Sequence, residues 1–219
     1  MAMVYAVLTG DIVGSSRLEA REQLVLKDSL KQSFKRVRDM YPDTGPLPSF
    51  DVFRGDSFQG VLDDAVYALE TSLLIRANLR KDQPPDQEVN WDARIAIGIG
   101  EIDYLPDNVS EGDGPAYRSS GPVLDRLKKD IRLEIHTPWQ EVNDELNTEC
   151  ALLDALIAGW TPPQAEAVVM LLEGKDRKQI GRELKISQAA VHYRVKGSGW
   201  FAVEKFINRY HTIITKNIN

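Results

Sequence analysis

The sequence predicts an α/β sandwich followed by an all-α region. Up to about residue 137, short runs of β-branched and aliphatic residues alternate with segments whose apolar residues recur at the helical period. Beyond that point the pattern is helical throughout. The charge changes nearby: residues 162–219 carry ten basic and five acidic residues, and the remainder carries 17 basic and 28 acidic. An acidic body suits metal binding, and a basic tail suits nucleic acid.

The first part reads as strands and helices of mixed order. We expect a strand over Val4 to Ile12, then a helix to about Tyr41 with Ser15 or Ser16 as its N-cap. Strands over 50–53 and 58–62 flank the turn sequence R-G-D-S, as in a hairpin. A helix over 65–81 and a strand over 91–102 follow, and Gly98 and Gly100 in that strand indicate close approach of a backbone or a ligand. A helix over 121–129 and a strand over 132–137 complete this part.

The second part reads as helices and turns. A helix around 142–158 leads to Thr161, which can cap a helix over 164–173. Helices over 178–185 and 188–196 come next, and the last helix has a broad apolar face from Trp200 to Ile214. We expect that face to pack on the two helices of the helix-turn-helix pattern over 178–196 or to form a dimer interface. We therefore predict three units: a first domain over 1–138, a connecting helix over 139–160, and a helical domain over 161–219.

The composition excludes several classes of protein. No apolar run approaches the roughly 20 residues that span a bilayer. The N-terminus has no basic segment followed by a long apolar one, so no signal peptide is expected. Cys150 is the only cysteine, which rules out an intrachain disulfide and disfavours a zinc cluster. We expect a cytoplasmic protein without a membrane partner.

Two carboxylates follow strand-like runs and suggest a metal site. Asp11 lies at the tip of the first strand, and Asp56 lies in the turn between the hairpin strands. Mg²⁺ or Mn²⁺ prefers such oxygen ligands, and the Ile12 carbonyl is a third candidate. Gly10, Gly14 and Gly55 leave backbone space for phosphates of a bound nucleotide. The alternative is that Asp11 caps the following helix and Asp56 is a turn residue.

Four motifs in order resemble the class III nucleotidyl cyclases: L-T-G-D-I-V-G-S-S, F-R-G-D-S-F, A-R-I-A-I-G-I-G-E-I and G-P-A-Y-R-S-S-G-P-V-L-D-R-L. The resemblance covers roughly residues 4–137. It implies a ferredoxin-like or palm-like nucleotidyl cyclase fold with Asp11 and Asp56 as metal ligands. It also implies that Arg126 is the arginine that stabilises the transition state.

Two positions depart from the cyclase pattern. Val52 stands where cyclases usually carry a base-reading lysine, and Pro122 stands where they carry an asparagine. Arg54, beside the hairpin aspartate, is a new candidate for phosphate binding. We therefore expect a site that binds a nucleotide with weak or no turnover.

A third candidate for phosphate binding precedes a helix. Arg118, Ser119 and Ser120 follow a glycine-rich loop, and free amides and hydroxyls there can hold a phosphate. The alternative is a helix start with Ser119 or Ser120 as its N-cap.

A wider resemblance spans almost the whole chain. The motifs T-G-D-I, F-R-G-D-S-F-Q, A-I-G-I-G, S-S-G-P-V-L-D and W-T-P-P-Q-A-E, followed by a helical end, resemble the SatD family of bacterial proteins. This resemblance implies an architecture more than a reaction.

The helical tail carries a helix-turn-helix pattern. Ile180, Leu184, Ile186 and Val191 supply a three-helix core, and Gly181 is the small residue where two helices cross. The pattern resembles the DNA-reading modules of sigma factors and response regulators. In such modules the second helix enters the major groove, and phosphate contacts position it. The residues expected at base edges are Ser187, Gln188, Ala189, His192 and Tyr193, and those expected at phosphates are Lys178, Arg194 and Lys196. Similar bundles also serve as protein-interaction modules.

Three functions remain open at this level. We expect a homodimeric DNA-binding regulator whose cyclase-like domain binds a nucleotide and a divalent metal. The second possibility is an active class III-like cyclase, a homodimer regulated by its C-terminal domain. The third is a catalytically dead palm fold that serves for dimerisation.

Overall fold

A five-stranded sheet forms the centre of the first part of the chain, in a computed structural model that describes residues 3–41, 49–53, 55–85 and 90–218. The strand order is β2-β3-β1-β4-β5, and every neighbouring pair is antiparallel except β4 and β5, which are parallel. The strands are β1 (Tyr5–Ile12), β2 (Ser49–Phe53), β3 (Ser57–Leu62), β4 (Ala93–Gly100) and β5 (Leu133–His136). The predicted strands are all present, with bounds shifted by a few residues at most.

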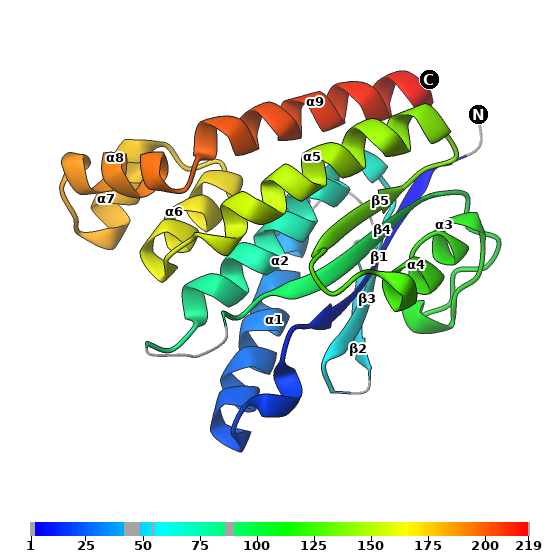
Figure 1. The fold of residues 1–219 in the computed structure, drawn as a ribbon, viewed down its shortest axis with the longest axis horizontal. Coiled ribbons are helices and arrows are strands. Elements are labelled where there is room, and N and C mark those ends of the chain that lie inside the picture. Colours follow the sequence, from blue (N-terminus) through cyan, green and yellow to red (C-terminus); the bar gives the residue numbers. More distant parts are fainter. Residues whose placement is uncertain (1–2, 42–48, 54, 86–89, 219) are drawn as a thin grey trace.

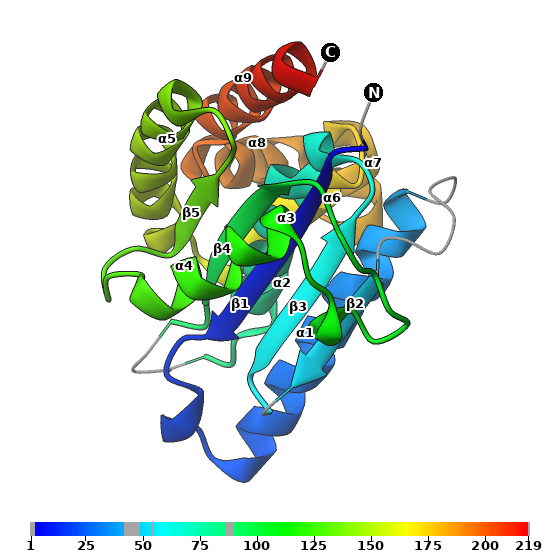
Figure 2. The same ribbon diagram turned by 90° about the vertical axis from the view of Figure 1, so that its right-hand side faces the viewer.

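Helices cover both faces of this sheet. Figure 2 shows α1 (Ala20–Met40) and α2 (Ala68–Asp82) behind the strands, and the short helices α3 (Pro115–Arg118) and α4 (Gly121–Arg126) on the near face. Single 3₁₀ turns lie at η1 (Ser15–Arg17), η2 (Ala65–Tyr67) and η3 (Val109–Glu111). The remaining helices are α5 (Gln140–Ala158), α6 (Pro162–Leu172), α7 (Arg177–Leu184), α8 (Gln188–Gly197) and α9 (Trp200–Ile218) (Figure 1). The mixed α/β class with a helical C-terminal part is confirmed.

Strand alternation sorts the side chains onto two faces. Ala6, Leu8 and Ile12 of β1 join the large core with α1 and α2, whereas Val7 joins a smaller cluster with Tyr117 on the other face. The predicted close approach at Gly98 is confirmed. An added Cβ there would lie 2.1 Å from the carbonyl oxygen of Ala116, so only glycine lets α3 rest on the strand backbone.

Two asparagines of α5 cover the free edge of β5. The Asn147 side chain accepts from the Ile135 amide and donates to the Ile135 carbonyl, both at 2.8 Å. Asn143 does the same at Thr137, at 2.7 and 3.0 Å. These amides replace a missing neighbouring strand, so the edge is closed to pairing with another chain.

A buried ion-pair cluster ties α2 to the start of β4 and to α5. The Arg76 guanidinium is fully buried and donates to Asp92 at 2.8 and 2.9 Å and to Asp154 at 2.5 Å. Burial alone would lower the pKa of Arg76, but the two carboxylates outweigh it and raise that pKa. A charge buried in this way is tolerated only because its partners are in place.

The start of the first helix differs from the prediction. Ser15 and Ser16 do not cap α1, because they form the 3₁₀ turn before it. Glu19 is the N-cap, and it forms a reciprocal capping box with Glu22. The Ser15 hydroxyl is therefore available for another partner.

The C-terminal helices share the core of the sheet part. One continuous apolar cluster runs from Ala6 to Ile214, so the expected boundary after Trp160 does not separate two cores. A small satellite cluster lies under α7 and α8. The apolar face of α9 packs on η2, α5 and α2, and α9 also contacts α8 of the helix-turn-helix, as expected. The Tyr210 hydroxyl donates to the Ala65 carbonyl at 2.8 Å. No helix of the described residues is long and apolar enough to cross a membrane.

Candidate functional site

The two predicted turns meet at one end of the sheet. In the β1–β3 ladder Asp11 stands opposite Ser57, the residue after Asp56. The Ile12 amide donates to the Asp56 carbonyl at 3.1 Å. The Ser15 hydroxyl donates to Asp56 Oδ2 at 2.5 Å. The β1 tip and the hairpin turn thus lie side by side, but Asp11 is not among the residues that line the cavity beside Asp56.

Asp11 already has a partner. Arg94, opposite Asp11 on β4, donates through Nε to Asp11 Oδ1 at 2.9 Å and through Nη2 to the other carboxylate oxygen. This hydrogen-bonded pair raises the pKa of Arg94. A divalent ion at Asp11 would compete with this guanidinium. This contact could not be predicted from the sequence, because Asp11 and Arg94 lie 83 positions apart and meet only through the β1–β4 register.

A small cavity of about 180 Å³ opens beside Asp56. Lys27 of α1 lines it together with the serines of η1, and its Nζ lies 3.9 Å from the position of an added Cβ on Gly55. Lys27 makes no ion pair with any described residue. The sequence reasoning missed this lysine, although Gln23 and Lys27 are one helical turn apart and share a face. The lining residues are Ser15, Ser16, Gln23, Leu26, Lys27, Gly55 and Asp56.

The predicted glycines do not all leave space for a phosphate. The space beside Gly10 is filled by the Phe58 ring, 2.3 Å from an added Cβ, so this glycine serves core packing. Gly14 (φ 71°) and Gly55 (φ 85°) adopt left-handed backbone conformations at the two turns, which favours glycine at both. Arg54 lies outside the described residues.

The remaining candidates of this part lie on the α3–α4 side. Ser120 is buried, and its hydroxyl is shared between Thr9 at 2.9 Å and the Tyr117 carbonyl at 3.2 Å. It is the N-cap residue of α4 but makes no capping hydrogen bond with its side chain. The Ser119 and Ser120 amides donate within the preceding turn. Arg118 pairs with Asp103 and Asp113 on the surface, and Arg126 is exposed at the end of α4.

The oxygens present fit at most a small metal site. Across the described residues there is no group of three or more His, Cys, Asp or Glu side chains placed to hold an ion. Asp56 keeps Oδ1 outside the contacts found among these residues, whereas both oxygens of Asp11 are engaged by Arg94. An ion such as Mg²⁺ in the cavity would therefore be held by Asp56, because Asp11 does not line the cavity and Arg94 engages both of its oxygens. It would supply charge neutralisation for phosphate oxygens.

The second candidate site lies on α7 and α8. Lys185 ends α7 in the left-handed conformation (φ 54°), and the Ile186 amide closes the turn on the Gly181 carbonyl at 3.1 Å. An added Cβ on Gly181 would lie 2.6 Å from the end of the Gln188 side chain and 3.3 Å from the Ile186 carbonyl oxygen, so α7 and α8 approach closely at this position, as predicted. Ser187 caps α8, as predicted, by accepting from the Ala190 amide at 3.1 Å.

Most of the predicted DNA-contact residues are solvent-exposed. The exposed set is Lys178, Ser187, Gln188, Ala189, His192, Tyr193 and Lys196. Arg194 differs, because it forms an ion pair at 2.8 Å with Glu166 of α6. Further exposed basic side chains on these helices make no ion pair with a described residue, and these are Arg177, Arg182 and Lys185.

Comparison with known proteins covers both sites. A family model described as the SatD family matches residues 5–207. The chain belongs to the SatD family. No curated protein and no solved structure matches it.

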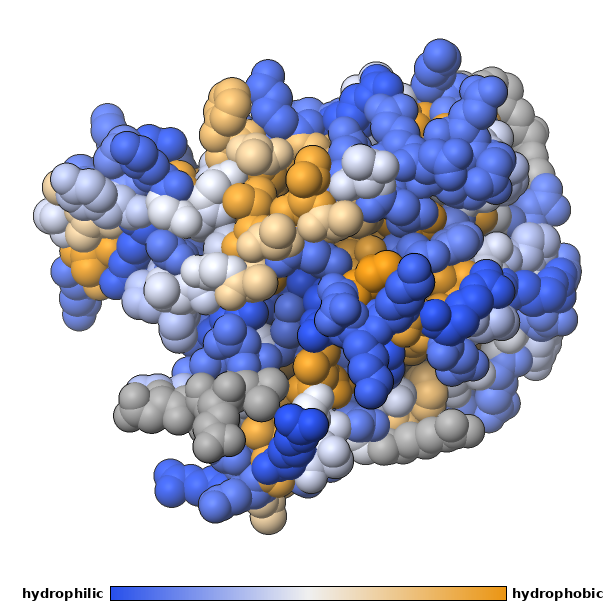
Figure 3. Space-filling view, viewed as in Figure 1, coloured by the Kyte–Doolittle hydropathy of each residue, from blue (hydrophilic) through white to orange (hydrophobic). Residues whose placement is uncertain are grey.

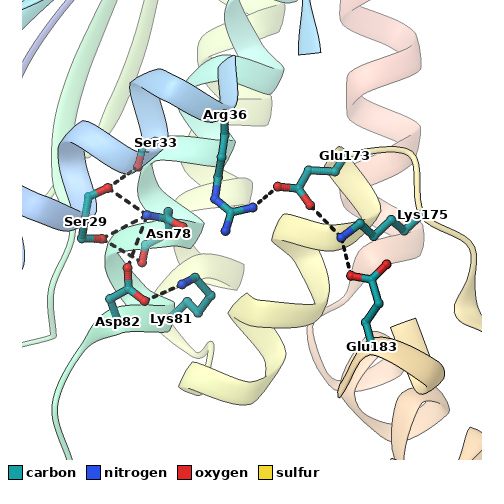
Figure 4. A network of polar contacts seen from close by, with 9 residues as sticks. All are labelled: Ser29, Ser33, Arg36, Asn78, Lys81, Asp82, Glu173, Lys175 and Glu183. Carbon is teal, nitrogen blue, oxygen red and sulfur yellow. Dashed lines mark hydrogen bonds and ion pairs between the residues drawn. The ribbon is translucent and has the colours of Figure 1, made fainter. Parts of the chain in front are cut away.

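In this SatD-family chain, a row of ion pairs joins the sheet part to α7. Arg36 of α1 pairs with Glu173, Lys175 lies 3.3 Å from Glu173 Oε2, and Lys175 Nζ lies 2.6 Å from Glu183 of α7. Figure 4 shows this row crossing from α1 to the end of α6 and on to α7. Because α1 also carries Lys27 at the cavity beside Asp56, the helix that lines this cavity is linked to α7 through Glu173 and Lys175 in the SatD-family protein.

Proposed function

We propose that this protein is a DNA-binding regulator whose sheet part binds a nucleotide together with Mg²⁺ or Mn²⁺. The proposal has two parts, a helix-turn-helix at α7–α8 and a cyclase-like nucleotide site at the β1 tip. The exposed face of α8 is the main observation in favour of DNA binding. A nucleotide would act as the signal that this DNA-binding part responds to.

Exposure and charge support DNA binding. A recognition helix must present base-reading side chains to solvent, and α8 exposes Gln188, His192 and Tyr193. Exposed basic residues on α7, α8 and their turn provide the positive charge that phosphates attract, and these are Arg177, Lys178, Arg182, Lys185 and Lys196. The three-residue connection between α7 and α8 has the length of a helix-turn-helix turn.

Strand order and turn contacts support the nucleotide part. The element order β1-α1-β2-β3-α2-β4, with β1 between β3 and β4, is that of a ferredoxin-like arrangement. Asp56, Ser15 and Lys27 surround a cavity large enough for a phosphate group but too small for a whole nucleotide. The base and sugar would therefore lie outside it. Engagement of Asp11 by Arg94 favours binding over turnover.

Titration of labelled DNA duplexes over a range of salt concentrations tests the DNA part. We expect the affinity to fall steeply with salt and to weaken in Lys178→Ala with Lys196→Ala. Lys128→Ala with Lys129→Ala, on the exposed turn after α4, is the matched control. Equal affinity in both double variants would contradict this docking model.

Thermal unfolding with a panel of nucleoside triphosphates and Mg²⁺ or Mn²⁺ tests the nucleotide part. A ligand present at a hundredfold its dissociation constant stabilises by about 2.7 kcal/mol. For a chain of this size we expect a rise of about 5–10 °C in the melting temperature. Lys27→Met should reduce the rise, and Lys31→Met, one turn further along α1 and exposed, should not. No rise with any nucleotide would favour a palm fold used only for dimerisation.

An active nucleotidyl cyclase is the second candidate. The meeting of Asp11 and Asp56 at one end of the sheet favours it, because such enzymes carry metal-binding aspartates at these places. Mass spectrometry of the products formed from nucleoside triphosphates tests it. A cyclic product that disappears in Asp56→Ala would replace the binding-only proposal.

A further inference from the structure

An apolar groove of about 500 Å³ runs between α5 and α9. Leu152, Leu156 and Phe201 line it, and their exposed fractions are 66%, 37% and 72%. Figure 3 shows the corresponding apolar patch over the facing parts of the two helices. Large apolar side chains this exposed and this close together are typical of an interaction surface.

The solvent face of α5 supports close approach by another helix. Ala151, Ala155 and Ala158 are exposed on the same helix as Leu152 and Leu156. Small side chains beside large ones create the ridges and grooves in which a second helix packs.

The groove also carries one charge of each sign without an ionic partner. Lys205 lies over the Phe201 ring at 5.7 Å from its centroid, and it makes no ion pair within the described part of the chain. Glu149 has a buried carboxylate oxygen, Oε2, with no hydrogen-bond partner. Burial is the largest cause of the raised pKa of Glu149. The nearby Glu145 raises this pKa further, and Arg209 lowers it. A surface that fits this groove must therefore offer apolar side chains, an acid for Lys205 and a base for Glu149.

We propose that the groove between α5 and α9 is the interface between two copies of this chain, related by a twofold axis. In a twofold interface, residue i of one copy contacts residue j of the other, and j contacts i. Lys205 of each copy then meets Glu149 of the other, and Leu152, Leu156 and Phe201 of both copies are removed from water together. A second copy thus supplies every group that the groove needs.

This interface does not depend on the proposed function, but it lies next to α8. An added Cβ on Gly199, in the turn from α8 to α9, would lie 3.3 Å from the Leu156 side chain. Two copies joined here would hold their two α8 helices at a fixed separation, as DNA readers of paired half-sites require.

The oligomeric state of the full chain tests the proposal. Light scattering and sedimentation should give twice the chain mass of 24.6 kDa at about 50 µM protein, a concentration that populates even micromolar dimers. Leu152→Glu should weaken dimerisation at least tenfold. Leu24→Glu is the matched control, because Leu24 is 65% exposed on the surface of α1, and it should leave the dimer unchanged.

A charge exchange tests the pairing itself. Lys205→Glu and Glu149→Lys should each weaken the dimer, and the double variant should restore it because each copy then offers the reversed pair. A monomeric wild-type protein at this concentration, or equal effects of Leu152→Glu and Leu24→Glu, would overturn the interface. A double variant no stronger than its parents would overturn the Lys205–Glu149 pairing.

Discussion

Substitution of Arg94 by glutamine should make the β1 tip a better metal site. Arg94 holds both oxygens of Asp11, and the two side chains are 28% and 23% exposed. Metal binding at Asp11 must therefore break this ion pair. Glutamine keeps much of the side-chain length and some hydrogen bonding but removes the charge.

The size of the effect follows from the exposure of the pair. Ion pairs with this degree of solvent contact are worth about 0.2–1 kcal/mol. Because each 1.4 kcal/mol is tenfold in a dissociation constant, loss of the pair alone tightens metal binding by up to about fivefold. Removal of a positive charge near a divalent cation acts in the same direction, so we expect a gain of about fivefold or more.

Titration with Mn²⁺, followed by electron paramagnetic resonance or calorimetry, measures the gain. Arg118→Gln is the control, because Arg118 pairs with Asp103 and Asp113 on the surface and makes no contact with Asp11. Asp11→Asn should abolish the gain when combined with Arg94→Gln. Unchanged Mn²⁺ affinity in a folded Arg94→Gln protein would refute the role of Asp11 as a metal ligand that Arg94 restrains.

Three further predictions concern stability and the DNA part. Arg76→Met leaves two largely buried carboxylates without their partner, so urea unfolding should show a loss of about 3–5 kcal/mol; Arg126→Met, on the surface, should change stability by less than about 0.5 kcal/mol. Lys196→Ala should lower the slope of log affinity against log salt by about 1. Arg194→Ala should lower it less, because an acid of α6 already neutralises that arginine. Burial raises the pKa of Cys150, so the folded thiol keeps its proton at pH values where the unfolded thiol ionises. This contribution to stability is complete below about pH 8.5 and is lost as the pH rises, by at most about 1.4 kcal/mol per pH unit. Urea unfolding between pH 7 and 10 should show a shallower fall in Cys150→Ala, and an equal fall would contradict the assignment.

The order of strands and helices was predictable because local patterns determine it. Alternating or continuous apolar runs marked all five strands, and Gly98 correctly indicated a backbone contact. The start of α1 was less accessible. Ser15 belongs to a preferred N-cap type and Glu19 does not, yet Glu19 caps α1 through its capping box with Glu22, and Ser15 bonds to Asp56, 41 positions away.

For the candidate site, the order of the sequence motifs predicted which turns meet but not which side chains pair there. The meeting of the β1 tip with the hairpin turn followed from the motif order, but the pairing of Asp11 with Arg94 depends on strand register, which no local pattern specifies. Lys27 was missed because one lysine on a helix surface looks like any other. Its position beside the cavity depends on how α1 packs against the sheet.

The division of the chain into units was less predictable than its elements. Composition and charge change near residue 160, yet α6 and α9 extend the same core as the sheet. Apolar periodicity shows that a helix face is buried but does not say against which partner. The face of α9 therefore allowed two partners, the helix-turn-helix or a second copy, whereas in the structure α9 contacts η2, α5, α8 and α2.

Helix α1 determines the direction in which Arg36, in the ion-pair row, points relative to Lys27, at the cavity. Lys27 and Arg36 are nine residues apart, which is about two and a half turns, so they point to opposite sides of the helix. One inserted residue between them would rotate Arg36 by about 100° relative to Lys27 and move it away from Glu173. Both side chains would still be present, and each local surface would look intact. The length of this stretch of α1 is therefore as much a part of the connection as the residues themselves, whereas the turns on either side of α1 can change length without altering it.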